Sequence, residues 1–513
     1  MRRAFPLLSV AIFLALVVAC RAPVDVAPTG TPAQNAIQEN RATATATAAT
    51  PLGDAIRENR ATATPLAATA TPIYAGPLSP PCGLSLPALP ADGPAASSVT
   101  LTDEAALRAI VPAAAWPAIE QLRDAPETVG LVAYQVGREA EGIYWNADTP
   151  MSLASVAKVI TLVAYVEAVA AGELNPQEIV PLAELERFYL PNFDLGAHQR
   201  ALAELRAEGR LLSPDDNPAV PLSEVPWMMI RHSSNAAADY LHLRLGQARI
   251  EDTARALGLD NPAGSHSAPC TFLGQFLLMA NHTRALANDT AALAAYFEDE
   301  AAYGREMALL ADAYAGQAEF RAAEAAWRER NRRPSIDTQR TFAARLAPRG
   351  TPRAYAALMA LLAGNGLSNA DSSFQARRYL EWPNQFENNL EWGSNIGYKN
   401  GALPGVLTTV YYAYRWDDPA AIVVALFYRD LPQDTYRRWR NDLPHDELAR
   451  WLLADPAAIP ALAAAIGMRE EGGRMREEGG GILALAAAIG PYRTRNDCAS
   501  ATACIRELTP NLP

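Results

Sequence analysis

The chain has 513 residues, of which 50% are hydrophobic and 19% are charged, and its formal net charge is −12. This length and this apolar content are sufficient for a folded domain of ordinary size with additional segments. The acidic balance, without a cluster of basic residues, argues against a nucleic-acid-binding protein, so no nucleic-acid partner is expected.

The first twenty residues have the pattern of an export signal. Residues 7–19 are apolar apart from Ser9, and Cys20 follows. This apolar run is short for a membrane span but suits a secretory signal. The ending VVAC at residues 17–20 resembles a bacterial lipobox, in which the cysteine is lipidated and becomes the mature N-terminus; an ordinary cleaved signal peptide is the alternative. We therefore expect an exported lipoprotein that Cys20 anchors to the membrane, at the cell surface or in the periplasm.

Residues 21–97 consist mostly of Ala, Thr and Pro. The stretch AIQENRATATATAATP from Ala36 recurs as AIRENRATATPLAATATP from Ala55. Such a segment buries too little apolar surface to fold, so it is predicted to be a disordered tether.

The cysteines and histidines indicate no metal site. The four cysteines beyond Cys20 have no CxxC spacing, and the six histidines form no HxH or HExxH arrangement. Neither a metal ion nor another cofactor is therefore expected. Cys498 and Cys504 are close enough in sequence to close a small disulfide loop, although the sequence does not assign the pairing.

Folded elements are expected from about residue 98. A helix capped by Thr102 or Asp103 is predicted to run towards Arg123. Residues 128–137 and 142–146 have the β-branched and aromatic content of strands. Their short link predicts an antiparallel hairpin.

A mostly helical region follows. The polar stretch before Ser155 leads into an apolar run, which predicts a helix ending at Gly172. Residues 182–282 are largely helical by pattern, and residues 283–330 are Ala-rich with many Glu and Arg, typical of added amphipathic helices. Thr351-Pro352 is predicted to begin another helix, because a proline in the first turn lacks only an N–H that has no partner there.

The C-terminal part contains two further strand candidates, residues 405–416 and 420–430, joined by a short turn. A last helix is predicted from Asp434 to about Leu453. Residues 456–513 are predicted to be a low-complexity tail, to which no function is assigned.

The order of these elements predicts the fold class. It is α/β in the α+β sense: an antiparallel β-sheet flanked by helices, with an inserted mostly helical lobe. The domain is predicted to span residues 98–455, with an extra helical insertion at about residues 251–350.

Lysine occurs at only two positions, Lys158 and Lys399, in a chain that otherwise uses arginine. A guanidinium stays protonated, whereas an ammonium can lose its proton when it is desolvated. Lys158 follows Ser155 in an SxxK pattern, and residues i and i+3 of a helix share a face. A desolvated lysine beside a serine hydroxyl can take its proton and make it nucleophilic. The alternative is that neither lysine has a role in catalysis.

Two further motifs follow, SSN from Ser233 and KNG from Lys399. In this order the three motifs resemble the S-x-x-K, S-D-N and K-T-G pattern of the serine β-lactamase and penicillin-binding protein superfamily, and most of all that of the class A β-lactamase-related serine hydrolases, in which the last motif lies on an edge strand. FYLP at residues 188–191 resembles the family's aromatic gate stretch. Residues 350–368 resemble the helix that precedes the KTG strand.

The resemblance implies a role for each matching residue. Ser155 would be the nucleophile, and Lys158 would be its base or the partner of that base in proton transfer. Ser233 would relay a proton to the leaving nitrogen, and the backbone N–H groups of Ser155 and Ala402 would form the oxyanion hole. The substrate-binding residues would be Asn235, Lys399, Asn400, Gly401, Ala402 and, at the entrance, Tyr189.

Three departures from the family pattern are present. Ser234 replaces the Asp of S-D-N. Asn400 replaces the Thr of K-T-G, whose hydroxyl would bind a substrate carboxylate, and an amide N–H is the expected substitute. The E-x-x-L-N stretch, whose Glu activates the deacylating water in class A enzymes, does not occur between residues 249 and 351. Asp337 is the carboxylate nearest the expected place and Glu298–Glu300 lie further away, but the role is not transferred to any of them.

The resemblance thus implies an enzyme, a serine hydrolase that cleaves β-lactam or related amide bonds through an acyl-enzyme on Ser155. Two alternatives stay open: a penicillin-binding-protein-like peptidase or amidase, and a non-catalytic lipoprotein that binds cell-wall peptide. The expected ligand is a small-molecule β-lactam or a peptidoglycan stem peptide.

Overall fold

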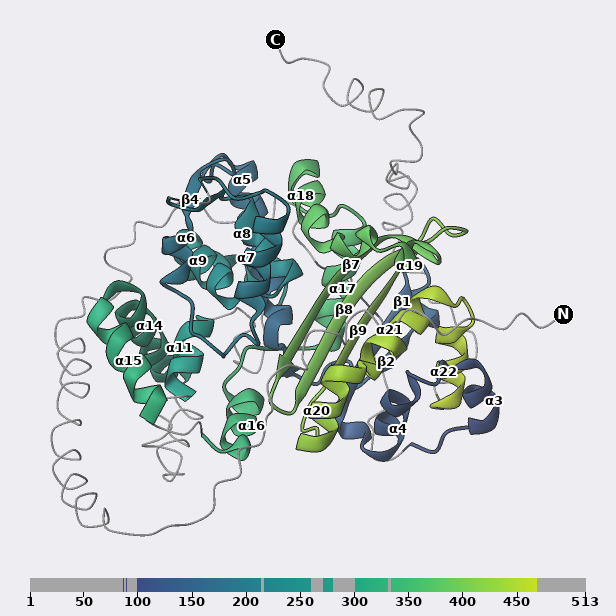
Figure 1. The fold of residues 1–513 in the computed structure, drawn as a ribbon. Helices are drawn as coiled ribbons and strands as arrows, with labels where there is room; N and C mark the ends of the chain where they lie inside the picture. The colour runs from purple at the N-terminus through teal and green to yellow at the C-terminus, as the bar shows by residue number, and fades with distance from the viewer. Residues whose placement is uncertain are drawn as a thin grey trace, which may run out of the picture. The chain divides into compact units, whose positions relative to one another are not determined.

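The computed structural model describes part of the chain, namely Leu86, Leu89 and residues 99–213, 216–259, 271–279, 300–330 and 334–467. These residues form an antiparallel β-sheet with helices on both faces and a mostly helical lobe beside it (Figure 1). The predicted signal peptide, nearly all of the predicted tether and the chain beyond residue 467 lie outside the described residues.

Five strands form the main sheet in the order β2-β1-β9-β8-β7, and each neighbouring pair is antiparallel. The strands are β1 (Val129–Gln135), β2 (Ile143–Trp145), β7 (Gly393–Leu403), β8 (Val406–Arg415) and β9 (Ala421–Tyr428). Both predicted hairpins, β1–β2 and β8–β9, are confirmed. The residue pattern alone did not predict β7, because its sequence GSNIGYKNGAL is rich in Gly and Asn, which strands usually avoid.

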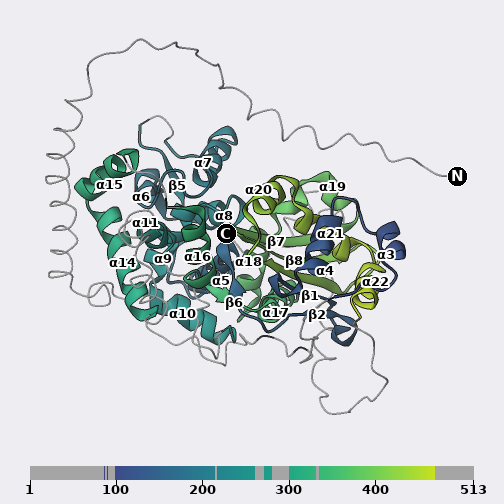
Figure 2. The same cartoon turned by 90° about the horizontal axis from the view of Figure 1, so that it is seen from below.

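The two faces of the sheet enter different cores. Leu131 of β1 and Leu426 of β9 belong to a core shared with the helices near the two ends of the folded domain. The neighbouring residue Gly130 points the other way, because successive strand residues alternate between faces, and Pro352 packs directly on it. Pro352 begins α17 (Pro352–Ala363), which was predicted to start here and which covers the second face (Figure 2). The helices of the first face are α3 (Glu104–Ile110), α4 (Trp116–Asp124), α20 (Gln433–Asp442), α21 (Pro444–Ala454) and α22 (Ala458–Ala465).

Two helices that were predicted as single units are divided. The predicted N-terminal helix is divided into α3, which ends at Ile110, and α4. The division occurs because Pro112 cannot donate to a helical hydrogen bond. The predicted last helix is divided at Leu443, whose φ of 51° is left-handed. α22 lies inside the segment that was predicted to be a tail, yet its Leu462 is fully buried in the core.

Among the described residues, no single helix is long and apolar enough to cross a bilayer. Only α21 and α22 taken together have the length and apolar composition of a span, and these two helices are bent by 119°.

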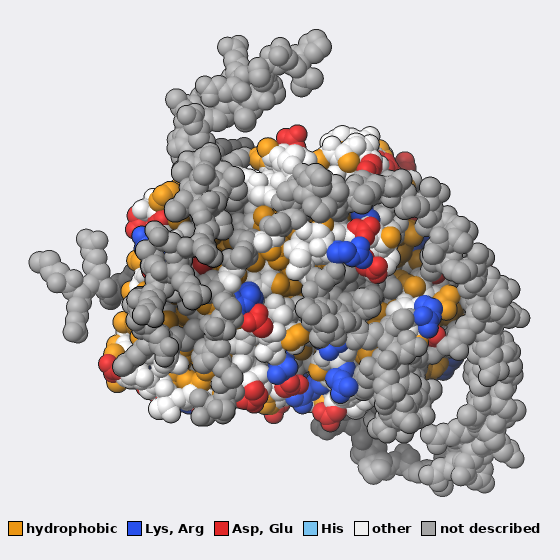
Figure 3. All heavy atoms as spheres, turned by 180° about the vertical axis from the view of Figure 1, so that it is seen from behind, with side chains coloured by type: hydrophobic (Ala, Val, Ile, Leu, Met, Phe, Trp, Pro, Cys, Tyr) orange, Lys and Arg blue, Asp and Glu red, His pale blue; other side chains and the backbone are white. Residues whose placement is uncertain are grey.

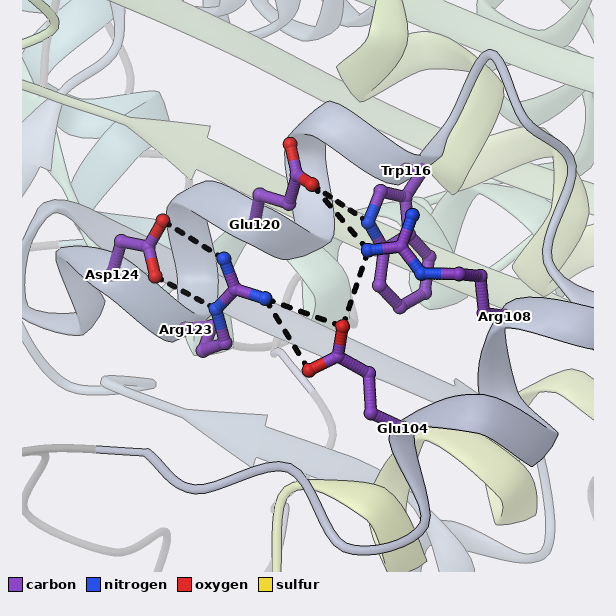
Figure 4. A network of polar contacts seen from close by, with 6 residues as sticks. All are labelled: Glu104, Arg108, Trp116, Glu120, Arg123 and Asp124. Carbon is purple, nitrogen blue, oxygen red and sulfur yellow. Dashed lines mark hydrogen bonds and ion pairs between the residues drawn. The ribbon is translucent and has the colours of Figure 1, made fainter.

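Charged side chains join α3 to α4 (Figure 4). Glu104 pairs with Arg108 at 3.1 Å and with Arg123 at 3.3 Å, and Arg108 lies 3.9 Å above the ring of Trp116. The charged side chains of this network are between 29% and 62% exposed, so solvent screens each pair and the pair contributes little to stability. Acidic and basic side chains are likewise interspersed on the reverse face of the domain (Figure 3).

The helical lobe is built around α5. Its elements are α5 (Lys158–Ala170), β4 (Ile179–Pro181), α6 (Leu182–Glu186), α7 (Ala197–Ala207), β5 (Ala219–Pro221), α8 (Glu224–Arg231), α9 (Asn235–Leu245), α10 (Gln247–Ala256), α11 (Phe272–Leu277) and α18 (Ala370–Leu380). The described part of the predicted insertion is helical, as α14 (Glu300–Gly316), α15 (Ala318–Arg330) and α16 (Ile336–Arg345). The short strands β3 (Met151–Ser152) and β6 (Arg349–Gly350) pair directly before the SxxK motif.

Candidate active site

Ser155 lies at the start of the helix that forms the centre of the lobe. It belongs to η5 (Ala154–Ala157), a 3-10 turn that continues into α5 at Lys158. Ala154 has a φ of 47°, a left-handed conformation that a non-glycine residue adopts at a cost in energy. Within residues 151–168, all of which the structure describes, Ser155 is the only residue that is not buried. The helix therefore presents a single hydroxyl to the surface.

The amine of Lys158 is held by the SSN motif. Lys158 is fully buried, and its Nζ donates to Ser233 O at 2.6 Å and to Asn235 Oδ1 at 2.7 Å. The same nitrogen lies 3.3 Å from Ser233 Oγ and 4.6 Å from the centre of the Phe272 ring. The first and second motifs are thus in direct contact.

This environment disfavours the charged form of Lys158. Burial lowers the pKa of Lys158 to about 7, although the carboxylates of Asp239 and Asp194 act in the opposite direction. A neutral amine has two N–H donors and one lone pair. The two short hydrogen bonds use both donors of the neutral amine, and its lone pair can accept a proton from a neighbouring hydroxyl, such as that of Ser233 at 3.3 Å.

The second lysine meets the first at Ser233. Lys399 Nζ donates to Ser233 Oγ at 3.0 Å and to Asn400 O at 2.8 Å. Burial, and secondarily the charge of Lys158, hold the pKa of Lys399 well below its usual range. Ser233 has a φ of 67°, a left-handed conformation that places its hydroxyl between the two amines.

Ser234 explains why the motif tolerates Ser in place of Asp. It is the N-cap of α9, and its Oγ accepts a hydrogen bond from Ala237 N at 3.1 Å. The same oxygen lies 3.0 Å from Nδ1 of the buried His198. Ser and Asp are both favoured N-cap residues, so the replacement retains the cap that orients Ser233 and Asn235.

The edge strand β7 passes directly beside the nucleophile turn. A Cβ at Gly401 would lie 2.7 Å from Ser155 N and 2.7 Å from Leu153 O, which is too close for any side chain. Thr408 Oγ1 of the neighbouring strand donates to Leu153 O at 2.9 Å and joins the strand pair to the turn. Glycine is therefore required at position 401 for steric reasons.

A cleft of about 330 Å³ opens over these groups. Six of the predicted site residues line it: Ser155, Ser233, Asn235, Asn400, Gly401 and Ala402. Lys158 and Lys399 lie beneath its surface and reach it through Ser233. The structure thus brings eight of the nine predicted catalytic and substrate-binding residues together.

Tyr189 is the ninth, and it does not line the cleft. Its ring stacks on His198 with the ring centres 4.9 Å apart, and its backbone O accepts a hydrogen bond from Tyr314. Phe193 and Asp194, a few residues further along the same loop, line the cleft instead. The sequence spacing did not predict which residues of this loop line the cleft, because three of them, Asn192, Leu195 and Gly196, have left-handed backbone conformations.

The wall formed by α11 carries no carboxylate. It presents Phe272, Gln275 and Phe276 to the cleft. Asp337 lies on α16 with its side chain 85% exposed and does not line the cleft. The acidic residues at 298 and 299 lie outside the described part of the chain.

The predicted lipidation site, Cys20, also lies outside the described residues, as do the other cysteines, Cys82, Cys270, Cys498 and Cys504. Within the described ranges, no group of three or more His, Cys, Asp or Glu side chains is arranged to hold a metal ion.

The described residues form an antiparallel sheet with a helical lobe and a candidate active site in the cleft at Ser155. A model of the β-lactamase enzyme family matches residues 114–445, more than half of the chain, so the protein belongs to the β-lactamase enzyme family. No curated protein sequence matches the chain.

Three similar solved structures illustrate the range of this likeness. A variant of a reconstructed last common ancestor of class A β-lactamases of Gram-negative bacteria is 14% identical, with 69% of this chain and 98% of that chain covered and a TM-score of 0.39. A β-lactamase from Sphaerobacter thermophilus is 18% identical, with 72% and 99% covered and a TM-score of 0.38. A structure of PBP-A is 14% identical, with 65% and 96% covered and a TM-score of 0.36.

Proposed function

We propose that the protein is a serine hydrolase that opens β-lactam or related amide bonds through an acyl-enzyme on Ser155. One observation carries the proposal: the buried Lys158 amine, with both donors occupied, lies one helical turn from a hydroxyl that faces a cleft. Membership of the β-lactamase enzyme family supports the same chemistry.

Acylation begins with activation of the nucleophile. The Lys158 amine accepts the proton of Ser155, and Oγ attacks the carbonyl carbon of the substrate. Negative charge then develops on the carbonyl oxygen, where the backbone N–H groups of Ser155 and Ala402 stabilise it. The close approach of Gly401 to the nucleophile turn holds these two segments together.

The leaving nitrogen needs a proton before the C–N bond breaks. Ser233 Oγ lies between Lys158 and Lys399, so it can pass a proton from the Lys158 amine to the leaving nitrogen. Asn400 lines the cleft and offers an amide N–H to a substrate carboxylate, where the family pattern has a threonine hydroxyl, and Lys399 holds Ser233 Oγ from beneath. The acyl group remains on Ser155 Oγ as an ester.

A fluorescent penicillin and a chromogenic cephalosporin test this proposal. We expect wild-type protein to be labelled and to hydrolyse the cephalosporin, and Ser155→Ala to do neither. Ser152→Ala is the matched control, because Ser152 is buried three residues earlier and its hydroxyl has no hydrogen-bond partner among the described residues. Equal labelling of Ser155→Ala and wild type would refute the proposal. Stable labelling without turnover would favour the penicillin-binding-protein-like alternative.

We also propose that the protein is exported and anchored by a lipid on Cys20, on the strength of the VVAC pattern at residues 17–20. In a bacterial host fed with labelled palmitate, wild-type protein is expected to carry the label and to fractionate with membranes. Cys20→Ala is expected to lose both. Labelling that persists in Cys20→Ala would contradict the assignment.

A further inference from the structure

One carboxylate lies in the cleft. Among the described residues that line it, Asp194 is the only Asp or Glu, and it shares the cleft wall with Ser155 and Asn235. Asp194 lies in the loop between α6 and α7, far in sequence from the three motifs. Its charge reaches the active-site amine, since it opposes the lowering of the Lys158 pKa.

A small cavity adjoins the cleft at this carboxylate. Its volume is about 10 Å³, and Phe193, Asp194, Asn235 and Phe276 line both it and the cleft. This is about the space that one water molecule occupies. A bound water needs at least two polar partners, and the Asp194 carboxylate and the Asn235 amide can accept and donate, respectively.

The carboxylate of Asp194 is held in position by the backbone. Oδ1 accepts a hydrogen bond from Gly196 N at 3.0 Å, and Oδ2 accepts one from His198 N at 2.8 Å. A carboxylate has about four lone-pair positions, so these two bonds leave acceptors free for a water molecule. Asn192 and Leu195, on either side, have φ values of 70° and 57°. These two bonds also cap the start of α7.

The inserted helices hold this part of the cleft. Tyr314 of α14 donates to Tyr189 O at 3.0 Å, and Arg328 of α15 donates to Pro191 O at 3.1 Å. Gly274 of α11 packs against the backbone of α14 so closely that no Cβ would fit. Helices α14 and α15 therefore contact both the Asp194 loop and the cleft wall on α11.

We propose that Asp194 is the general base of deacylation, an inference that rests on the proposed acyl-enzyme. The carboxylate takes a proton from a water molecule while the water oxygen attacks the acyl carbon. The tetrahedral intermediate then collapses, and the bond between that carbon and Ser155 Oγ breaks. The proton returns to Oγ, and the product leaves as a carboxylic acid. The chain thus hydrolyses its acyl-enzyme with a base from the α6–α7 loop.

The test separates the two half-reactions in the full-length protein. Asp194→Asn keeps one oxygen acceptor for the two backbone N–H groups but cannot take up the proton. With a chromogenic cephalosporin, rapid mixing and mass measurement of quenched samples, we expect an acylation rate constant within threefold of wild type and a deacylation rate constant at least about 100-fold lower. The acyl-enzyme then accumulates. Asp337→Asn, which removes an exposed carboxylate outside the cleft, is the control and should leave both constants unchanged.

The outcomes are distinguishable. Deacylation of Asp194→Asn at the wild-type rate would overturn the inference. A parallel loss of both rate constants would also overturn it, because a structural role of Asp194 predicts that result. If the wild-type acyl-enzyme forms but is never hydrolysed, Asp194 is not a base for deacylation, whereas the proposed acylation of Ser155 still stands. Absence of any adduct on wild type would refute the proposed function itself.

Discussion

Replacement of Lys158 by arginine is expected to lower the rate of acylation of Ser155 at least about 100-fold, because a guanidinium stays protonated and cannot accept the serine proton. The arginine can still donate to Ser233 O and Asn235 Oδ1, the two acceptors that Lys158 uses, so the domain should stay folded. The measurements are the second-order rate constant for a chromogenic cephalosporin and the thermal unfolding midpoint.

Lys158→Met provides the matched variant. Methionine fits a buried site without carrying a charge, so it removes the base, and Ser233 O and Asn235 Oδ1 lose the Lys158 donor. It is expected to show the same loss of acylation in a folded protein. Undiminished acylation in either variant would refute the assignment of Lys158 as the base.

The same assignment predicts the pH dependence of acylation by the wild type. Burial lowers the pKa of Lys158 to about 7, so the amine is protonated and inactive below that pH and free to accept a proton above it. The acylation rate constant should therefore fall about tenfold for each pH unit below 7 and level off above it.

The second large effect is expected at Gly401. Gly401→Ala places a Cβ against Ser155 N and Leu153 O, both backbone atoms that cannot move without displacing the nucleophile turn. We expect the acylation rate to fall at least about 100-fold, since small displacements of reacting groups cost this much, and the free energy of unfolding to fall by about 1–3 kcal/mol. Acylation kinetics and urea denaturation measure the two effects.

Gly304→Ala is the control for this substitution. Gly304 lies in α14, and a Cβ there meets no atom within 4 Å. Alanine in a helix interior is favoured over glycine by about 0.5–1 kcal/mol, so this variant should keep its activity and be slightly more stable. A Gly401→Ala variant that behaves like Gly304→Ala would show that β7 does not constrain the site.

The motifs were predictable because their chemistry is local. The spacing of Ser155 and Lys158 predicted that the two residues share a helix face. The retention of only two lysines pointed to Lys158 and Lys399, whose amines the structure joins through Ser233 Oγ. The strand hairpins were predictable for a similar reason, since runs of β-branched and aromatic residues separated by short turns specify them.

Other parts of the site depend on packing that no local pattern records. β7 is a strand because it pairs with β8, although its own residues disfavour one. Tyr189 lines the small cavity beside the cleft, where its ring packs against that of His198 and the insertion binds its backbone. Asp194 reaches the cleft only through a loop whose path is set by tertiary contacts, so its position could not be read from spacing.

The central claim is that Ser155 becomes acylated, and peptide mapping by mass spectrometry tests it most directly. Wild-type protein is mixed with a penicillin, quenched in acid within the first turnovers, digested and analysed. We predict that the peptide containing Ser155 gains the full mass of the penicillin, because opening the lactam ring loses no atoms, and that fragmentation places the added mass on Ser155. An adduct on another residue, or an unmodified Ser155 peptide while penicillin is consumed, would contradict the claim.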